Sequence, residues 1–183
     1  MRRRRSGVTA VEVCAVVCVV GILLAIVVPA FVREARLSKT AEAAQLLETL
    51  YQRSAAYFAA EHEGNGEGPP LRRCLPVPAG PTPRQPSPDG ELVAFADPER
   101  AGAAPWEALG FQPEVPVRYS YTFEPTTPGC GLRAPEGTYL VTFRAEGDLD
   151  GDGERSLLER RATATPEGDL VPFGILYVRD RVE

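Results

Sequence analysis

The fold of this chain is organised by residues 13–32, which read VCAVVCVVGILLAIVVPAFV. These twenty residues carry no charge, and as a helix they are long enough to cross about 30 Å of hydrocarbon. A cluster of four arginines, Arg2 to Arg5, precedes them, and such clusters stay on the cytoplasmic side of a membrane. The stretch therefore predicts one membrane-spanning helix, with the remainder of the chain on the far side.

Two simpler interpretations of this segment are a cleaved secretory signal and a plain membrane anchor. The apolar run is longer than the roughly 7–15 residues usual in a signal peptide, and the best small-residue cleavage site, Val28-Pro29-Ala30, contains a proline. A plain anchor leaves Glu12 unexplained, because a carboxylate at the edge of an apolar helix is costly and normally has a partner.

The remaining composition is that of a chain that folds around a core. Of 183 residues, 44% are hydrophobic and 25% are charged, which suffices for one domain with an appendage. The formal charge is −5, and it becomes −9 if the four leading arginines are removed. Such an acidic chain is a poor candidate for binding nucleic acid through a broad basic surface.

The sequence offers little material for catalysis. It contains one histidine, His62, and no nucleophile–base pair, phosphate-binding loop or dinucleotide fingerprint. We expect His62 to be an ordinary residue at a helix end, and we do not expect an enzyme.

The N-terminal residues resemble those of a known family. The segment Ser6-Gly7-Val8-Thr9-Ala10-Val11-Glu12, followed by the apolar run, is similar to the start of type IV prepilins and of type II secretion pseudopilins. In that family a basic leader ends in glycine, a membrane peptidase cleaves after it, and the new N-terminus is N-methylated. The resemblance implies a leader of residues 1–7, cleavage between Gly7 and Val8, and methylation of Val8. Val8 departs from the family, which usually has phenylalanine there.

The resemblance also implies how the protein would assemble. Glu12 corresponds to the glutamate at the fifth mature position, and Gly21 and Pro29 are residue types common at their positions in the family. Cleavage would expose an α-amino group that can pair with Glu12 of a neighbouring subunit, which makes two charges tolerable in an apolar bundle and favours one axial register. Glu12 is thus expected to be an assembly determinant, together with Gly21 and Pro29.

Partners and location follow from the same resemblance. It implies copies of this chain or other pilins in a filament, the prepilin peptidase and methyltransferase, and an assembly platform in the bacterial inner membrane. The chain would cross that membrane once, with its C-terminal domain in the periplasm, before it joins a pilus or pseudopilus. The alternative is a membrane-anchored or secreted calcium-binding module that does not polymerise.

Beyond the membrane the helix is expected to continue to about residue 62. Apolar residues recur every three or four positions, which is the pattern of an amphipathic helix; they are Ala41, Ala44, Leu47, Tyr51, Ala55 and Phe58. Pro29 should bend the helix or open its hydrogen bonding locally. The glycines at positions 64, 66 and 68 should end it.

The rest of the chain predicts a sheet that covers the exposed half of the helix. Residues 63–90 are rich in glycine and proline and are expected to form a loop, after which residues 91–183 alternate in hydrophobicity as strands do. Strands are expected at 117–123, 139–143 and 174–178, with another at 92–95, and a short helix at 105–110. The fold class is therefore α+β, with a long N-terminal helix packed on a small antiparallel sheet.

Four cysteines fall in two contexts. Cys14 and Cys18 lie on one face of the apolar helix, where they are expected to act as small hydrophobic residues. Cys74 and Cys130 are the only cysteines outside the membrane segment, and in an oxidising compartment they should form a disulfide.

Residues 148–159 match the twelve-residue calcium-loop pattern D-x-D-x-D-G-x5-E. The expected ligands are Asp148, Asp150, Asp152, the backbone carbonyl of Glu154, Ser156 directly or through water, and Glu159. The segment before the pattern is predicted to be a strand, so the site would not be a helix–loop–helix EF-hand. The alternative is an exposed acidic turn between two strands.

Overall fold

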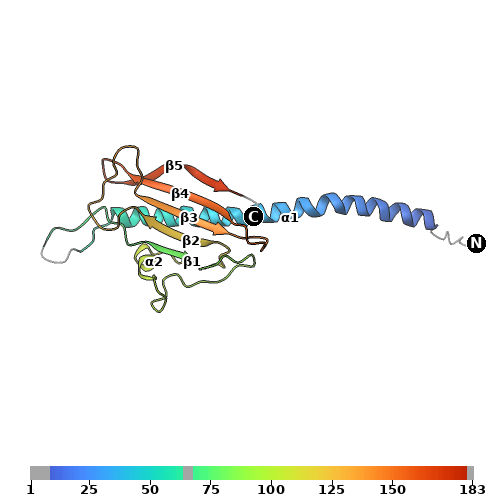
Figure 1. Cartoon of the computed structure of the whole chain (residues 1–183), viewed down its shortest axis with the longest axis horizontal. Coiled ribbons are helices and arrows are strands. Elements are labelled where there is room, and N and C mark those ends of the chain that lie inside the picture. The colour runs from blue at the N-terminus through green and yellow to red at the C-terminus, as the bar shows by residue number, and fades with distance from the viewer. Residues whose placement is uncertain (1–8, 64–67, 181–183) are drawn as a thin grey trace, which may run out of the picture.

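The computed structural model of the chain describes residues 9–63 and 68–180. Its elements are α1 (Ala10–Ala59), β1 (Ala79–Thr82), α2 (Ala104–Leu109), β2 (Ser120–Pro125), β3 (Val141–Gly147), β4 (Ser156–Ala164) and β5 (Leu170–Arg179). The five strands form one antiparallel sheet in the order β1-β2-β3-β4-β5. The C-terminal half of α1 lies along this sheet, and the N-terminal half extends beyond it (Figure 1). The predicted α+β layout is confirmed.

Helix α1 contains 50 residues and is therefore about 75 Å long. It runs through Pro29 as one element. The helix ends at Ala59, and Ala60 is already extended while its backbone N–H donates to Ala56 and Tyr57. The end thus comes before the glycine-rich segment, which is not what terminates it. The two-residue bridge between His62 and Leu71 instead directs the chain back along the domain.

The face of α1 that packs on the sheet differs in part from the predicted stripe. Leu47 and Phe58 are fully buried as expected, but the predicted Ala41 is exposed. The buried line also contains residues that the prediction omitted, namely Thr40, Ala43, Leu50 and Ser54. Ser54 can be buried because its hydroxyl donates to the carbonyl of Leu50 at 2.8 Å. The sequence pattern was too broad to decide which side of the stripe faces the sheet.

Ion pairs at the border of this interface fix the position of the helix. Glu42 of α1 accepts from Arg118 at 2.6 Å, and Glu48 is paired with Arg160 of β4. The Arg160 guanidinium also lies 5.3 Å from the ring centre of Tyr51, whose hydroxyl donates to the carbonyl of Leu170. These contacts attach α1 to the sheet at several heights along the helix axis.

Three of the expected strands are present with shifted bounds, and one is absent. β2, β3 and β5 overlap the predicted segments 117–123, 139–143 and 174–178. Residues 92–95 form no strand: Val93 and Phe95 enter the core from a loop that Gln112 holds through hydrogen bonds to both Val93 and Ala96. Phe95 then packs edge-to-face on Trp106 of α2, the short helix that the sequence predicted.

Two strands were not predicted. β1 lies inside the glycine- and proline-rich segment 63–90, where Ala79 and Thr82 pair with Phe123 and Tyr121. Gly80 in this strand has a φ of 96°, and a Cβ there would lie 2.3 Å from the carbonyl oxygen of Tyr121. β4 begins at Ser156, inside the stretch that the calcium pattern covers. Both strands are recognisable only through their pairing partners.

Candidate functional site

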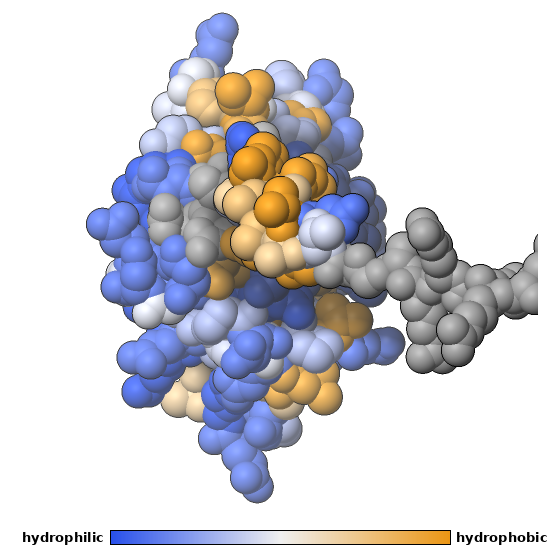
Figure 2. Space-filling model, turned by 90° about the vertical axis from the view of Figure 1, so that its right-hand side faces the viewer, coloured by the Kyte–Doolittle hydropathy of each residue, from blue (hydrophilic) through white to orange (hydrophobic). Residues whose placement is uncertain are grey.

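The N-terminal half of α1 is one large apolar surface. Every residue from Thr9 to Ala35 is exposed in the isolated chain, including Val11 at 78% and Phe31 at 73%. Among the described residues, α1 is the one helix long and apolar enough to cross a membrane. Figure 2 looks at the molecule from this end and shows apolar side chains in the foreground, against the largely hydrophilic surface of the sheet domain. Water is a poor solvent for such a surface.

Glu12 lies in the first turn of this apolar helix and closes a capping box with Thr9. Its Oε2 accepts hydrogen bonds of 2.8 Å from both the backbone N–H and the hydroxyl of Thr9, and the Glu12 N–H donates to that hydroxyl at 3.3 Å. Its Oε1 makes no hydrogen bond with any described residue. The capping box therefore holds the carboxylate in one orientation.

The other residues assigned to processing and assembly have different surroundings. Gly7 and Val8, the expected cleavage and methylation residues, lie outside the described residues. Gly21 is open, because a Cβ placed on it would meet no atom within 4 Å. Pro29 lies within α1, and Cys14 and Cys18 are free and exposed on the same apolar half.

The loop between β3 and β4 brings three of the expected calcium ligands together. One carboxylate oxygen from each of Asp148, Asp150 and Asp152 lies within 4.8 Å of the others. Asp148 accepts backbone hydrogen bonds from Gly151 at 2.7 Å and Gly153 at 3.2 Å. Both glycines have positive φ angles, which the tight turn requires. The loop is thus an ordered acidic turn at the end of a hairpin.

The remaining expected ligands are used elsewhere. Ser156 is buried, pairs with Gly147 as the first residue pair of the hairpin, and donates its hydroxyl to the Gly147 carbonyl at 3.2 Å. Glu154 is exposed in the loop. Glu159 lies three pairs further along β4, about 10 Å from the hairpin end. The pattern of twelve residues is therefore divided between an eight-residue loop and a strand.

Glu159 is occupied by two arginines. Its Oε2 accepts from Nε of Arg144 at 2.8 Å, and its Oε1 accepts from Nε of Arg161, also at 2.8 Å. Burial of the Glu159 carboxyl group raises its pKa, but the hydrogen bonds from Arg144 and Arg161 outweigh this effect, so that the net pKa lies below its ordinary value. The ionised Glu159 side chain thus belongs to a charge ladder, the row of Glu124, Arg144, Glu159 and Arg161 on the outer face of the sheet.

The predicted disulfide between Cys74 and Cys130 is present. It joins the segment that follows α1 to the connection between β2 and β3. Backbone hydrogen bonds run beside it, from Gly131 to Arg72 at 2.9 Å and from Leu132 to Arg73 at 3.1 Å. Two segments far apart in the sequence are therefore held side by side.

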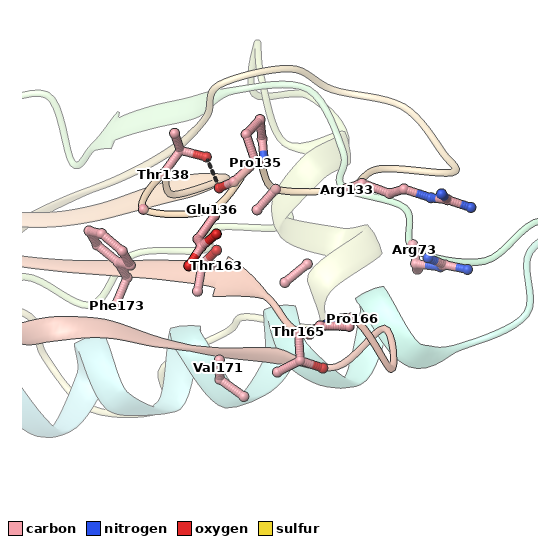
Figure 3. Close-up of a pocket in the computed structure, with 13 residues that line it drawn as sticks. Arg73, Arg133, Pro135, Glu136, Thr138, Thr163, Thr165, Pro166, Val171 and Phe173 are labelled. Atoms are coloured by element: carbon pink, nitrogen blue, oxygen red, sulfur yellow. Dashed lines mark hydrogen bonds between the residues drawn. The ribbon is translucent and has the colours of Figure 1, made fainter.

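A groove that the sequence did not reveal lies next to this disulfide. It has a volume of about 740 Å³ and lies between the β2–β3 connection and the β4–β5 hairpin (Figure 3). Its lining combines apolar residues with charged and polar ones; these include Arg73, Arg133, Glu136, Thr165, Val171 and Phe173. No local pattern marks these residues, because they come from three separate segments.

No protein-family model, no curated protein and no solved structure matches this chain. The structural class of the protein therefore follows from its fold. It is an α+β protein with an N-terminal helix of membrane-spanning length and a five-stranded antiparallel sheet that buries the C-terminal half of that helix.

Proposed function

We propose that this protein is a structural subunit of a type IV pilus-like filament or a type II secretion pseudopilus. The observation that carries the proposal is Glu12, which is held by a capping box in the first turn of an otherwise apolar, fully exposed half-helix. Its distance from Gly7 in the sequence, and the sheet that covers only the other half of α1, support the same function.

The proposed life cycle has a membrane stage and a filament stage. The precursor crosses the bacterial inner membrane once, with the sheet domain in the periplasm, and is cleaved after Gly7, whereupon Val8 becomes the methylated N-terminus. The assembly platform then moves it into the filament, where its apolar half-helix packs among those of other subunits. The disulfide between Cys74 and Cys130 suits an oxidising compartment such as the periplasm.

Polar contacts would give this assembly its register. Lipid tails are about as apolar as leucine, so that moving the helix from membrane to filament gains little from the hydrophobic effect. Packing and charge pairs must then select the arrangement. The α-amino group of Val8 in one subunit would donate to the carboxylate of Glu12 in its neighbour, which satisfies two charges that are each costly alone.

Mass spectrometry of the mature N-terminus tests the proposal directly. A chain that begins with N-methylated Val8 is the expected result. A chain that begins at Phe31 would indicate a cleaved secretory signal, and an intact Met1 would indicate a plain anchor; either result would contradict the filament function.

A second candidate function is a membrane-anchored or secreted calcium-binding module that does not polymerise. The clustering of the Asp148, Asp150 and Asp152 carboxylates is the observation that favours it. Calcium prefers six to eight oxygen ligands, and Glu159 supports this candidate less, since both its oxygens are bonded to arginines. The module and the filament subunit differ in the mature N-terminus, so the same measurement separates them.

A further inference from the structure

We propose that the groove beside the disulfide binds the acidic β3–β4 loop of a second copy of this chain. The groove and the loop would form a head-to-tail contact between neighbouring sheet domains. The inference rests on the proposed function in one respect only, namely that copies point the same way and are shifted along one axis, as subunits of a filament are.

The groove presents two arginines that have no acidic partner of their own. Arg72, Arg118, Arg144, Arg155, Arg160 and Arg161 each form an ion pair within the domain. Among the described residues, Arg73 and Arg133 form none, which is also true of Arg53, Arg84 and Arg100. Figure 3 shows their guanidinium groups at one end of the groove, extending in the same direction. Glu136 is the acidic residue of the groove lining, and Glu167 and Asp169 share an adjoining hollow with Arg73, so the two guanidinium groups have acidic neighbours but form no ion pair with them.

The two arginines belong to a preformed structure. Arg73 directly precedes Cys74, and Arg133 follows Cys130 by three residues, so the disulfide holds their segments together. The backbone bond from Leu132 to Arg73 reinforces this arrangement. Less conformational entropy is therefore lost when a ligand binds there.

The acidic loop is the matching surface on the same chain. Asp148, Asp150, Asp152 and Glu154 fall within seven residues, and the last three of them are exposed. Leu149 is buried and anchors the loop. Within the loop, Asp148 accepts a hydrogen bond from the backbone N–H of Gly151, and Asp152 accepts one from that of Glu154. The loop is thus an ordered, negatively charged turn, whereas the groove offers two guanidinium groups without ion pairs next to apolar walls.

The loop and the groove lie at opposite ends of the sheet. β3 and β4 are joined at the end that faces the N-terminal half of α1, whereas the β2–β3 and β4–β5 connections lie at the far end (Figure 1). In copies that point the same way, an axial shift brings the loop of one towards the groove of another. Such a contact uses two different surfaces and does not close on itself, which is the property that builds a filament.

A lipid headgroup is a poorer occupant than the loop. The groove lies beside the C-terminal end of α1 (Figure 3), and helix residues 33–59 alone cover about 40 Å from the end of the apolar stretch. An anionic lipid of the membrane that holds the chain would not reach it. A second copy that is shifted along the common axis brings its acidic loop to the height of the groove.

Site-specific cross-linking of the full chain in detergent, where copies are free to shift along their helix axes, tests the contact. Cys14→Ser and Cys18→Ser remove the free thiols and leave the disulfide intact. One copy then carries Glu136→Cys in the groove and a co-expressed copy carries Glu154→Cys in the loop, which keeps both arginines and all three aspartates. A short bismaleimide should join the two copies into a dimer. Glu99→Cys, an exposed glutamate in another loop, replaces Glu154→Cys as the matched control.

Charge reversal identifies the cause of the cross-link. Arg73→Glu with Arg133→Glu in the groove copy should lower the yield about tenfold, to the level of the Glu99→Cys control. Asp150→Lys with Asp152→Lys in the loop copy should then restore it, which simple misfolding would not allow. Equal cross-linking yields from Glu154→Cys and Glu99→Cys would overturn the contact. So would a yield that stays the same in the charge-reversal variants.

The outcome is separable from that of the proposed function. Filaments that require Glu12 and begin at Val8, but that give no cross-link between groove and loop, would refute the contact alone. A cross-link that obeys the charge reversal in a chain whose N-terminus is not Val8 would support the contact and refute the filament function.

Discussion

Glu159 of β4 accepts a 2.8 Å hydrogen bond at Oε2 from Nε of Arg144, its register partner on β3. Arg144 also pairs with Glu124 on β2, and Arg161 holds the other oxygen of Glu159. Four charged side chains thus cross three adjacent strands on the outer face of the sheet. The residue that the calcium pattern assigned to the metal is part of this ladder.

Glu159→Ala should destabilise the sheet whether or not calcium is present. The substitution leaves Arg144 and Arg161 without a buried acceptor, which costs about 2 kcal/mol of unfolding free energy. Chemical denaturation of the full chain in detergent, with and without calcium, measures this loss. A loss seen only with calcium would mean that Glu159 acts as a metal ligand.

The same carboxylate predicts an acid sensitivity. Its pKa is lower in the folded chain than in the unfolded one, so ionised Glu159 stabilises the fold above the unfolded pKa of about 4.3. This stabilisation is lost as the pH falls through the lower folded pKa. Denaturation at neutral pH and at a series of pH values falling through and below the unfolded pKa should show a smaller pH dependence for Glu159→Gln than for the wild-type chain. An identical pH dependence in the two proteins would contradict the assignment.

Calcium should stabilise the domain through the three aspartates. Their carboxylates repel one another, and a divalent cation that binds only the folded loop adds about 2.7 kcal/mol at a hundred times its dissociation constant. Thermal melting of the full chain with millimolar calcium or with chelator should show a higher midpoint with calcium. Asp150→Asn with Asp152→Asn should abolish the shift, whereas Glu159→Ala should keep it. If calcium does not raise the melting midpoint of the wild-type chain, residues 148–155 are an acidic turn without a metal site.

A fragment that begins at residue 63 should not fold, whereas one that begins at residue 36 should. The helix contributes Leu47, Leu50 and Phe58 to the core, and each contributes about 1.5–3 kcal/mol when buried. Their loss is comparable with the entire stability of a typical domain, about 5–15 kcal/mol. Near-ultraviolet circular dichroism of the two fragments, with the buried Trp106 as a reporter, distinguishes these outcomes.

Glu12→Ala and Glu12→Gln should both insert and be cleaved but should yield few filaments. Alanine removes the capping box as well as the charge, whereas glutamine retains an oxygen that can accept from Thr9. Thr9→Ala is the matched control, because it weakens the cap and keeps the carboxylate. Sheared filament yield should be near normal for Thr9→Ala only. Normal yield from Glu12→Gln would show that the charge is not needed.

Gly7→Leu should leave the seven-residue leader attached. The peptidase that processes prepilins, the family that this N-terminus resembles, cleaves after glycine. A branched side chain at position 7 would obstruct the cleavage. The variant should remain in the membrane with an intact N-terminus by mass spectrometry. Normal trimming would put the cleavage site elsewhere.

Local patterns were sufficient for the elements whose signals lie within a few residues. The apolar run and the three-to-four-residue spacing predict α1, and Pro105 with Gly110 delimits α2, because helices are held by bonds between near neighbours in sequence. The Cys74–Cys130 pair also followed from the sequence, since the other two cysteines lie in the apolar stretch. The buried face of α1 was predicted only in part, because small residues surround the helix on several sides.

The tertiary structure alone decided features that depend on a partner far along the chain. β1 is a four-residue strand that contains Pro81, and it is a strand because Phe123 and Tyr121 lie opposite it. The calcium pattern assigned Glu159 to a loop, but the register of β3 against β4 puts Arg144 beside it, and a bonded guanidinium satisfies a carboxylate as a metal would. The groove with Arg73 and Arg133 likewise exists only once the disulfide has brought two distant segments together. Strand pairing and charge pairing are set by spatial neighbours, which a sequence pattern does not contain.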